Sequence, residues 1–307
     1  MRILITGAAG NLGSFLSRHL SVSPHQLRLM THRRPFNEEP GNAEVVRADL
    51  GDSETLAGVC DGVDCIVHFA GILFAPQPEK FLPTTNVRYV ENLIAAALAA
   101  GVKKFILVSF PHVEGETTPE RRATDRMDGT PDSVHARTRL EAERHVAARM
   151  PQPVILRVGM IYGRGVLMID AARWLAKRRL LAVWRQPTWI HLLSLPDFLD
   201  ATTAAIENPT ARGIYNLGDD RPMTLQEFLD AASAHWGCRQ PWRAPRWMFP
   251  CAGAACEVFA ALFRTRAPLT RDFIRIGMAS YAMDTSRMKT DLLSRLKYPV
   301  LHPQGVL

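Results

Sequence analysis

The chain has 307 residues, of which 47% are apolar and 22% are charged. This length and composition suit one large α/β domain, or a large domain with a smaller one, and exclude global disorder. The formal net charge is +7, carried mostly by scattered arginines. Such a charge attracts an anionic ligand, although an Arg-rich solvated surface explains it more simply. Because no dense Lys/Arg run is interleaved with aromatic residues, we expect no nucleic-acid partner.

The five cysteines are odd in number, irregularly spaced and without a CxxC pair. This pattern predicts reduced thiols, with neither a disulfide framework nor a metal site. No signal peptide precedes the first predicted strand, so we expect a cytoplasmic protein. The longest apolar stretch, Cys251 to Phe263, contains Glu257 and is too short to cross a bilayer. We interpret it as a core or lid helix and expect no membrane partner.

Apolar runs alternate with amphipathic stretches throughout the first half of the chain. The predicted strands are Arg2–Thr6, Gln26–Thr31, Glu44–Arg47, Cys65–His68, Lys104–Ser109 and Val154–Val158. The predicted helices between them are Asn11–Ser21, Ser53–Cys60, Phe81–Ala100 and Val134–Met150. Strands that alternate with helices form right-handed βαβ units. We therefore predict an α/β fold, with a doubly wound parallel sheet over residues 1–163.

The second half, residues 164–307, is less regular and holds all six tryptophans. Its predicted elements are helices near Met168–Lys177, Pro196–Ile206 and Thr224–Trp236, and a strand at Ile214–Leu217. Thr224 with Glu227 three residues later predicts a capping box. We expect a smaller, partly helical substrate region over the carboxyl ends of the strands, with some elements returning to the first domain.

A glycine-rich turn joins the first predicted strand to the first predicted helix. It reads Thr6-Gly7-Ala8-Ala9-Gly10-Asn11-Leu12-Gly13. Glycines allow the backbone to approach a pyrophosphate closely, and the free N–H groups at the helix start bind the anion. The turn predicts a Rossmann dinucleotide-binding domain with the phosphates at Gly7, Ala9, Gly10, Asn11, Leu12 and Gly13.

From this turn onward the chain resembles the extended short-chain dehydrogenase/reductase family, of the NAD(P)-dependent epimerase/dehydratase type. Asp49-Leu50 resembles the family's acidic pair at the adenine, His68-Phe69-Ala70-Gly71 its HxAG stretch, and Arg157 to Gly163 its RPxxxYG segment. The resemblance is specific up to Gly163 and looser beyond it. It implies further cofactor contacts from Asp49, Leu50, Phe69, Ala70, Gly71 and Gly159.

The end of the second predicted strand indicates which dinucleotide binds. An NAD-specific site usually places an acid there to hold the ribose hydroxyls. Thr31 takes that position here and is followed by His32, Arg33 and Arg34. Two guanidiniums can clamp a 2′-phosphate, which a carboxylate would repel. An exposed basic loop is the alternative, but the phosphate-binding turn upstream favours NADP(H).

The family's catalytic residues are all substituted. The family uses a Tyr as acid, a Lys four residues later and a Ser at the end of the fifth strand. His135 to Glu143 (HARTRLEAE) resembles its YxxSKLEAE stretch, so His135 takes the Tyr position and Arg139 the Lys position. The Ser position falls on Phe110, with Ser109 adjacent.

Different roles remain open to these residues. Arg139 can hold the ribose but does not shuttle protons. His135 can be a general acid, since imidazole titrates near neutrality, or an ordinary cleft residue. His135, Arg139 and Ser109 are the candidate catalytic residues.

Three functions agree with these substitutions. The first is an NADPH-dependent ketoreductase whose substrate donates its own proton, so that the protein only positions the reactants. The second is a non-catalytic NADP(H) sensor, and the third is a sugar-nucleotide reductase or epimerase with His135 as a replacement acid. We take the first as the working hypothesis.

The substrate expectation rests on the same substitutions. A ketone beside its own phenol carries an internal proton donor, as in hydroxylated aromatic polyketides and quinones. The substitutions at the Ser, Tyr and Lys positions resemble those of atypical ketoreductases of antibiotic biosynthesis. Those enzymes act on such polyketides, including angucyclinone-type compounds. The Trp- and Met-rich second half agrees with a flat apolar ligand, although core packing also explains it. A small-molecule aromatic ketone is therefore the expected partner, and a homodimer is compatible with the sequence.

Overall fold

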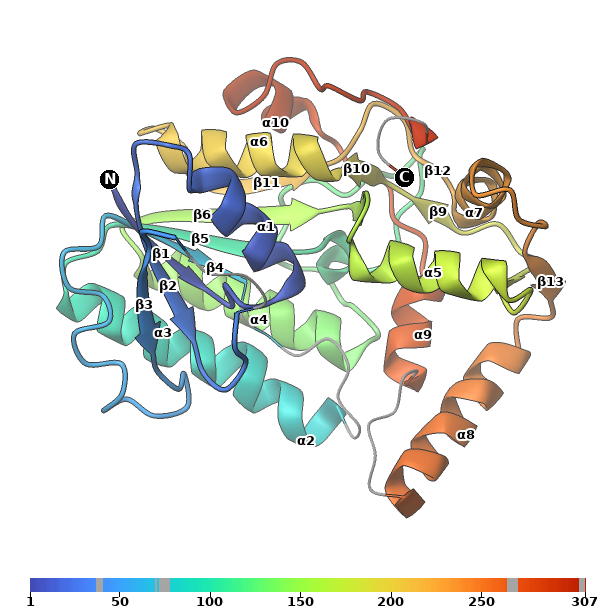
Figure 1. Ribbon diagram of the computed structural model, residues 1–307, viewed down its shortest axis with the longest axis horizontal. Helices are drawn as coiled ribbons and strands as arrows, with labels where there is room; N and C mark the ends of the chain where they lie inside the picture. Colours follow the sequence, from blue (N-terminus) through green and yellow to red (C-terminus); the bar gives the residue numbers. More distant parts are fainter. Residues whose placement is uncertain (37–40, 70, 72–77, 264–269, 304–306) are drawn as a thin grey trace.

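A seven-stranded parallel sheet forms the centre of the computed structural model, which describes residues 1–36, 41–69, 71, 78–263, 270–303 and 307 (Figure 1). The strand order is β11-β6-β5-β4-β1-β2-β3. The strands are β1 (Arg2–Thr6), β2 (Gln26–Thr31), β3 (Glu44–Arg47), β4 (Cys65–His68), β5 (Lys104–Ser109), β6 (Gln152–Val158) and β11 (Gly213–Leu217). The order reverses between β1 and β4, and ligands of doubly wound sheets bind at the carboxyl ends beside this point. The predicted fold class is confirmed.

Helices cover both faces of the sheet because successive strand side chains point to opposite faces. Ile3 and Ile5 pack with α1 (Asn11–Leu20) and α6 (Leu195–Glu207). Leu4, between them, packs with α3 (Tyr89–Ala99) and α4 (Val134–Arg149) on the other face. Figure 1 shows the two layers on either side of the strands. Strands buried on both faces read as unbroken apolar runs, as in β1.

Two predicted helices differ in the structure. The first, Ser53–Cys60, is a series of turns. The Arg28 guanidinium binds the backbone carbonyls of Val59 and Asp61 at 2.8 and 2.9 Å, and Gly58 has φ 74°, so a regular helix cannot continue there. The second, Phe81–Ala100, is split into α2 (Pro78–Leu82), a π-helical segment η1 (Pro83–Arg88) and α3.

The second half of the chain adds short strand pairs and helices at the carboxyl ends of the sheet (Figure 1). The strand pairs are β7 (Met160–Tyr162) with β10 (Leu192–Ser194), β8 (Ala182–Trp184) with β13 (Trp242–Ala244), and β9 (Trp189–Ile190) with β12 (Met223–Thr224). The helices are α5 (Leu167–Lys177), α7 (Leu225–His235), α8 (Met248–Phe263), α9 (Arg271–Met278) and α10 (Ser286–Asp291). The predicted capping box at Thr224 and Glu227 is present. α6 and β11 return to the central sheet.

The apolar segment at residues 251–263 is helical as predicted, and of the two predicted roles, core or lid helix, the core role is wrong. Only Gly253 and Ala260 of α8 are buried. The helix packs on α9 along one side and leaves its larger side chains in solvent. Among the described residues, no helix has both the length and the apolar character that a membrane crossing requires.

The contrast between Leu93 and Leu98 tests the packing of α3. Leu93 is fully buried against the sheet, whereas Leu98 on the same helix is 39% exposed. We expect Leu93→Ala to lower the free energy of unfolding by about 2–5 kcal/mol, because it leaves a cavity. Leu98→Ala is the control and should cost less than about 1 kcal/mol. Urea denaturation measures both values, and equal losses would contradict the described packing.

Candidate cofactor and substrate site

The glycine-rich turn between β1 and α1 has the shape that an anion requires. Gly7 has φ 71°, and the Gly10 N–H donates to the Gly7 carbonyl at 2.8 Å. A Cβ at Gly10 would lie 2.9 Å from that carbonyl oxygen, and one at Gly13 only 2.3 Å. α1 begins at Asn11 without a side-chain cap and without an acid in its first turn, so its free N–H groups fit a pyrophosphate.

Asn11 joins this turn to the second half of the chain. Its Nδ2 donates to the Gly165 carbonyl at 2.8 Å, and its Oδ1 accepts the Leu167 N–H at 2.9 Å. Both bonds hold the start of α5 beside the turn. The neighbouring positions Ala9 and Leu12 lie in the turn and in the first turn of α1.

The four residues at the end of β2 lie at the same edge of the sheet. Thr31 is buried and its hydroxyl donates to the Arg34 carbonyl at 2.5 Å. His32 Nε2 lies 3.3 Å from the Asp49 carboxylate, so these two side chains face each other. The side chains of Arg33 and Arg34 are exposed.

The remaining predicted cofactor residues follow other strands at this edge. Leu50 follows β3 and is buried. Phe69 follows β4 and meets the ring of Phe198 edge-on, with the two ring centroids 6.2 Å apart. Gly159 follows β6 and donates its N–H to the Leu217 carbonyl. Ala70 lies outside the described residues.

Arg139 on α4 points toward Gly71. Its side chain is buried, and a Cβ at Gly71 would lie 2.9 Å from its Nη2. Within the described residues, neither Nε nor Nη1 of Arg139 has a hydrogen-bond partner, and neither does Asn86 Oδ1 beside it. Burial lowers the pKa of Arg139 to about 10, so it stays charged at neutral pH. Buried unsatisfied donors of this kind fit the hydroxyls of a cofactor ribose.

An aromatic cluster occupies the position of the family's catalytic residues. The ring centroid of His135 lies 5.0 Å from that of Phe110, and the His112 ring lies 5.3 Å from Phe110 and 4.5 Å from Tyr281. Burial, with the nearby charge of Arg139 and the imidazole of His112, lowers the pKa of His135 to about 3. Burial lowers the pKa of His112 to about 4. Both imidazoles are therefore neutral at pH 7.

The Ser109 hydroxyl is turned away from this cluster. It donates to the Glu143 carboxylate at 2.5 Å, and Glu143 binds the guanidinium of Arg157 at 2.7 Å. Ser109 and Phe110 are consecutive, so their side chains point to opposite sides. The structure therefore gives Ser109 a partner inside the protein and not the role of orienting a substrate oxygen.

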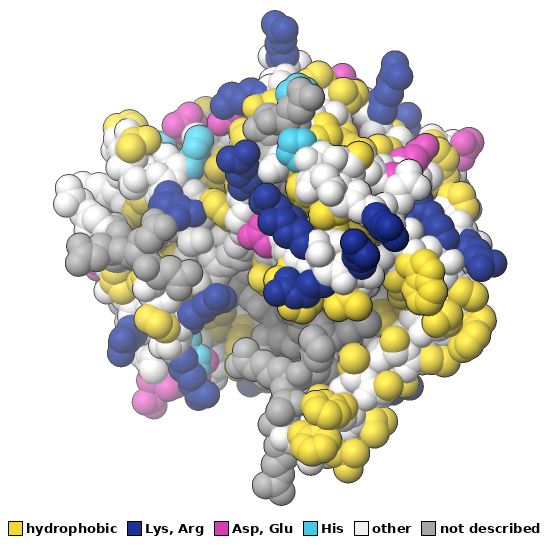
Figure 2. All heavy atoms as spheres, turned by 45° about the vertical axis from the view of Figure 1, so that its right-hand side comes forward, with side chains coloured by type: hydrophobic (Ala, Val, Ile, Leu, Met, Phe, Trp, Pro, Cys, Tyr) yellow, Lys and Arg dark blue, Asp and Glu magenta, His cyan; other side chains and the backbone are white. Residues whose placement is uncertain are grey.

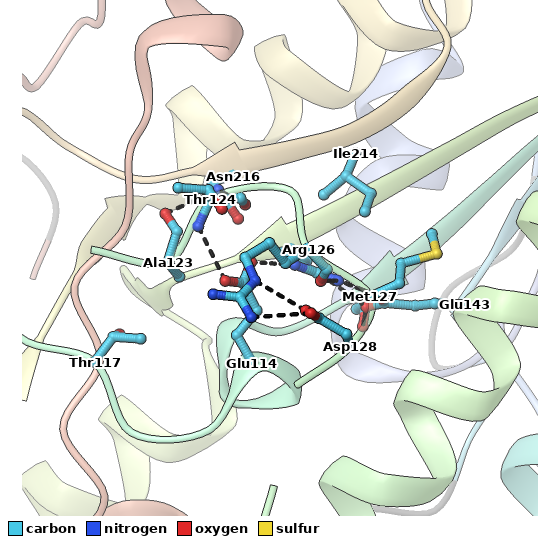
Figure 3. A network of polar contacts seen from close by, with 12 residues as sticks. Glu114, Thr117, Ala123, Thr124, Arg126, Met127, Asp128, Glu143, Ile214 and Asn216 are labelled. Atoms are coloured by element: carbon cyan, nitrogen blue, oxygen red, sulfur yellow. Dashed lines mark hydrogen bonds and ion pairs between the residues drawn. The ribbon is translucent and has the colours of Figure 1, made fainter. Parts of the chain in front are cut away.

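A buried ionic network surrounds Arg157. Figure 3 shows its members Glu114, Arg126 and Glu143. Arg157 is fully buried and binds Glu143, Glu114 and the carbonyl of Arg126. Glu114 in turn accepts the Thr124 N–H at 3.1 Å. The network fixes the loop after β5 to β6 and to α4.

A cleft of about 930 Å³ opens beside His112 and Ala136. Its walls combine the start of α4 with the second half of the chain, including Trp247 and Pro250. Arg185, Arg246 and Arg275 also line it. This volume suits a bulky organic molecule.

The comparisons with known proteins agree with this geometry. The profile of the NAD dependent epimerase/dehydratase family matches residues 3–218. The chain belongs to this family.

Individual relatives span several chemistries. A uronate dehydrogenase from Pseudomonas putida is 32% identical over 143 residues, which are 46% of this chain and 53% of that enzyme. The chain thus matches only about half the length of that relative. A 2-alkyl-3-oxoalkanoate reductase from Stenotrophomonas maltophilia is 28% identical, with 88% of this chain and 87% of the enzyme covered.

Solved structures share the fold. A dTDP-glucose 4,6-dehydratase from Streptomyces venezuelae, with NAD and TYD bound, superposes with a TM-score of 0.75. It is 19% identical, and the match covers 97% of this chain and 92% of that one.

His112 and Tyr281 belong to the site but were missed in the sequence. His112 is in a short 3₁₀-helix, η2 (Pro111–Glu114), and Tyr281 follows α9 far along the chain. Neither residue falls in a family motif. Only the packing of their rings against each other in the structure identifies them. The Tyr281 hydroxyl accepts the Met160 N–H at 3.1 Å, just beyond Gly159.

Buried neutral histidines predict acid sensitivity. Burial lowers the pKa of His68 and His135 to about 3 and of His112 and His191 to about 4. Histidines of the unfolded chain bind a proton near pH 6.5. The contribution of the buried neutral histidines to the free energy of unfolding is therefore complete above that pH and is lost as the pH falls.

We expect the unfolding free energy to drop between about pH 6.5 and 5, by up to about 1.4 kcal/mol per pH unit for each such histidine. Denaturation in urea at several pH values measures the slope. The slope of the unfolding free energy against pH gives the number of protons bound on unfolding. His112→Phe retains an aromatic ring and should lower that number by one. If the unaltered protein takes up less than one proton on unfolding, these imidazoles are not buried and neutral.

Proposed function

We propose that this protein is an NADPH-dependent ketoreductase that reduces a carbonyl on a bulky aromatic substrate, with the substrate donating the proton. The single observation behind this proposal is the aromatic cluster at the catalytic position. Phe110 has no titratable group, and His135 is neutral at pH 7. Burial raises the pKa of the Tyr281 hydroxyl in the same cluster, which makes it a weak acid, so a reductase with this site is best served by a proton from the substrate.

The cofactor proposal rests on four features at one edge of the sheet. The turn at Gly7 to Gly13 suits a pyrophosphate, and Arg139 has unsatisfied donors for a ribose. Arg33 and Arg34 add two exposed guanidiniums where a 2′-phosphate would lie, and no acid follows β2 directly. NADPH, when bound, supplies the hydride for the carbonyl carbon.

The protein's own groups then orient and shield the reactants. Arg139 holds the ribose, and its charge favours the developing negative charge on the carbonyl oxygen. The rings of Phe110, His112 and Tyr281 keep water away from that oxygen. A phenol beside the ketone delivers the proton, so the carbonyl becomes an alcohol without a protein acid, and the phenolate regains its proton from water when the product leaves.

The size of the cleft and one relative favour a ketone of this kind. The cleft of about 930 Å³ is large enough for a fused-ring substrate. The reductase from Stenotrophomonas maltophilia, which aligns over most of the chain, is named for a 3-oxo substrate. Both agree with ketone reduction.

The cofactor preference can be measured directly. We expect NADPH to bind more tightly than NADH, and Arg33→Ala with Arg34→Ala to weaken NADPH binding by about tenfold while NADH binding stays the same. Isothermal titration gives both dissociation constants. Arg149→Ala, at the distal end of α4, is the control. Equal affinity of the unaltered protein for both cofactors would refute the NADP proposal.

The proton source is tested on enzyme and substrate together. We expect His135→Phe to lower kcat by less than about tenfold, because a true general acid contributes about 10²–10⁴-fold. Methylating the phenol beside the ketone should reduce kcat far more. The assay is NADPH consumption, with deuterium transfer from labelled cofactor to the product carbon.

Other results identify another acid or another function. If Tyr281→Phe or His135→Phe abolishes turnover while the methylated substrate reacts normally, the protein provides the acid. If NADPH binds but no phenolic ketone, simple ketone or sugar nucleotide is turned over, the sensor hypothesis replaces the ketoreductase.

A further inference from the structure

Helix α8 exposes most of its large apolar side chains, while its two buried residues, Gly253 and Ala260, are small. Gly253 packs so closely on α9 that a Cβ there would lie 2.7 Å from Ile274 Cδ1, and Ala260 is also buried. Phe259 and Leu262 are 56% and 73% exposed. A helix that served only the core would be oriented the opposite way.

The apolar surface continues beyond α8 onto the neighbouring strand pair. We call it the α8 surface, and its exposed large side chains are Leu180, Trp242, Trp247, Met248, Val258, Phe259, Leu262 and Phe263. β13 pairs with β8, and the Trp242 N–H donates to the Leu181 carbonyl, so Trp242 lies beside Leu180. The Trp184 ring meets Phe249 edge-on at 5.2 Å and links the strand pair to α8. Figure 2 shows apolar side chains gathered on this face of the molecule.

Most of the charges around this surface are positive, although Asp230 binds Arg243 of β13 at 2.5 Å. Residues 171–185 contain five Lys or Arg and no acid, and residues 239–256 contain three Arg and no acid. Glu257, the acid of α8, is bound by Arg271 at 2.7 Å and through the Arg271 backbone N–H at 2.8 Å. Lys and Arg side chains flank the apolar ones in Figure 2.

We propose that the α8 surface docks on an anionic lipid bilayer. Large apolar side chains enter the boundary between headgroups and acyl chains, tryptophans lie at that depth, and the basic rim meets the anionic headgroups. A second copy of the chain is the less suitable occupant, because symmetric contact would bring the two cationic rims together. No spanning helix is required, so the expectation of no membrane partner, which rested on segment length, does not address this mode of binding.

Vesicle binding tests the proposal independently of any enzymatic activity. The full chain is sedimented with vesicles of phosphatidylcholine alone and of phosphatidylcholine mixed with phosphatidylglycerol. We expect about tenfold tighter binding to the anionic vesicles, and a loss of this preference at high salt. Equal or absent binding to both vesicles would overturn the proposal.

Variants then locate the contact. Phe259→Glu with Leu262→Glu should reduce vesicle binding at least about tenfold, because two charges would enter the apolar layer. Val22→Glu is the matched control, since Val22 is 91% exposed but lies in the turn between α1 and β2. Circular dichroism checks that both variants are folded. Unchanged binding by the double variant would refute the assignment to α8.

Two further measurements keep the result unambiguous. Brominated lipids should quench the tryptophan fluorescence of the unaltered protein, and Trp247→Phe should weaken this quenching, because Trp247 is 68% exposed on the α8 surface. Light scattering reports the oligomeric state. One combined result would assign the surface to self-association instead. The unaltered protein would form a dimer and not bind vesicles, and Phe259→Glu with Leu262→Glu would dissociate that dimer.

Discussion

The buried guanidinium of Arg157 is the interaction on which the arrangement of the site depends. Glu143 from α4 and Glu114 from the segment after β5 both bind it, so one cation joins β6, α4 and a long loop. Each charge is costly to bury alone, and removing one partner would leave the others uncompensated. The network therefore sets the position of α4 against the sheet. His135 and Arg139 lie eight and four residues before Glu143, on the same helical face, and are placed by the same contact.

The chemistry of the site follows from this placement. Arg139 is brought to the carboxyl edge of the sheet with donors that find no partner among the described residues, while the nearby rings are apolar or neutral. A site with one fixed positive charge and no acid that titrates near neutrality can bind a cofactor and orient a carbonyl. The hydroxyl of Tyr281 is the proton donor nearest these rings, and burial raises its pKa. This is why the proposed substrate must include the donor.

The second half of the chain gives the molecule two surfaces of different character. One is the cleft, where Arg185, Arg246 and Arg275 stand among apolar groups. The other is the α8 surface, whose large side chains remain in solvent. Trp247 belongs to both, so the mouth of the cleft adjoins the apolar surface. Some of the arginines that look scattered along the sequence lie together here, since Arg185, Arg246 and Arg275 line one cleft.

Local patterns determined the sheet and the glycine-rich turn, because strands buried on both faces appear as apolar runs and a close backbone contact requires glycine at fixed positions. β1, β2, β3, β4 and β5 begin and end where the sequence predicted. The sequence failed at residues 53–60, where Gly58 has a positive φ that a helix excludes and the distant Arg28 binds the carbonyls of Val59 and Asp61 just after it. It also could not show that Ser109 turns toward Glu143, that Tyr281 and His112 pack beside His135, or that α8 has its small side chains inside. These depend on contacts between segments far apart in the chain, and only the tertiary structure brings those segments together.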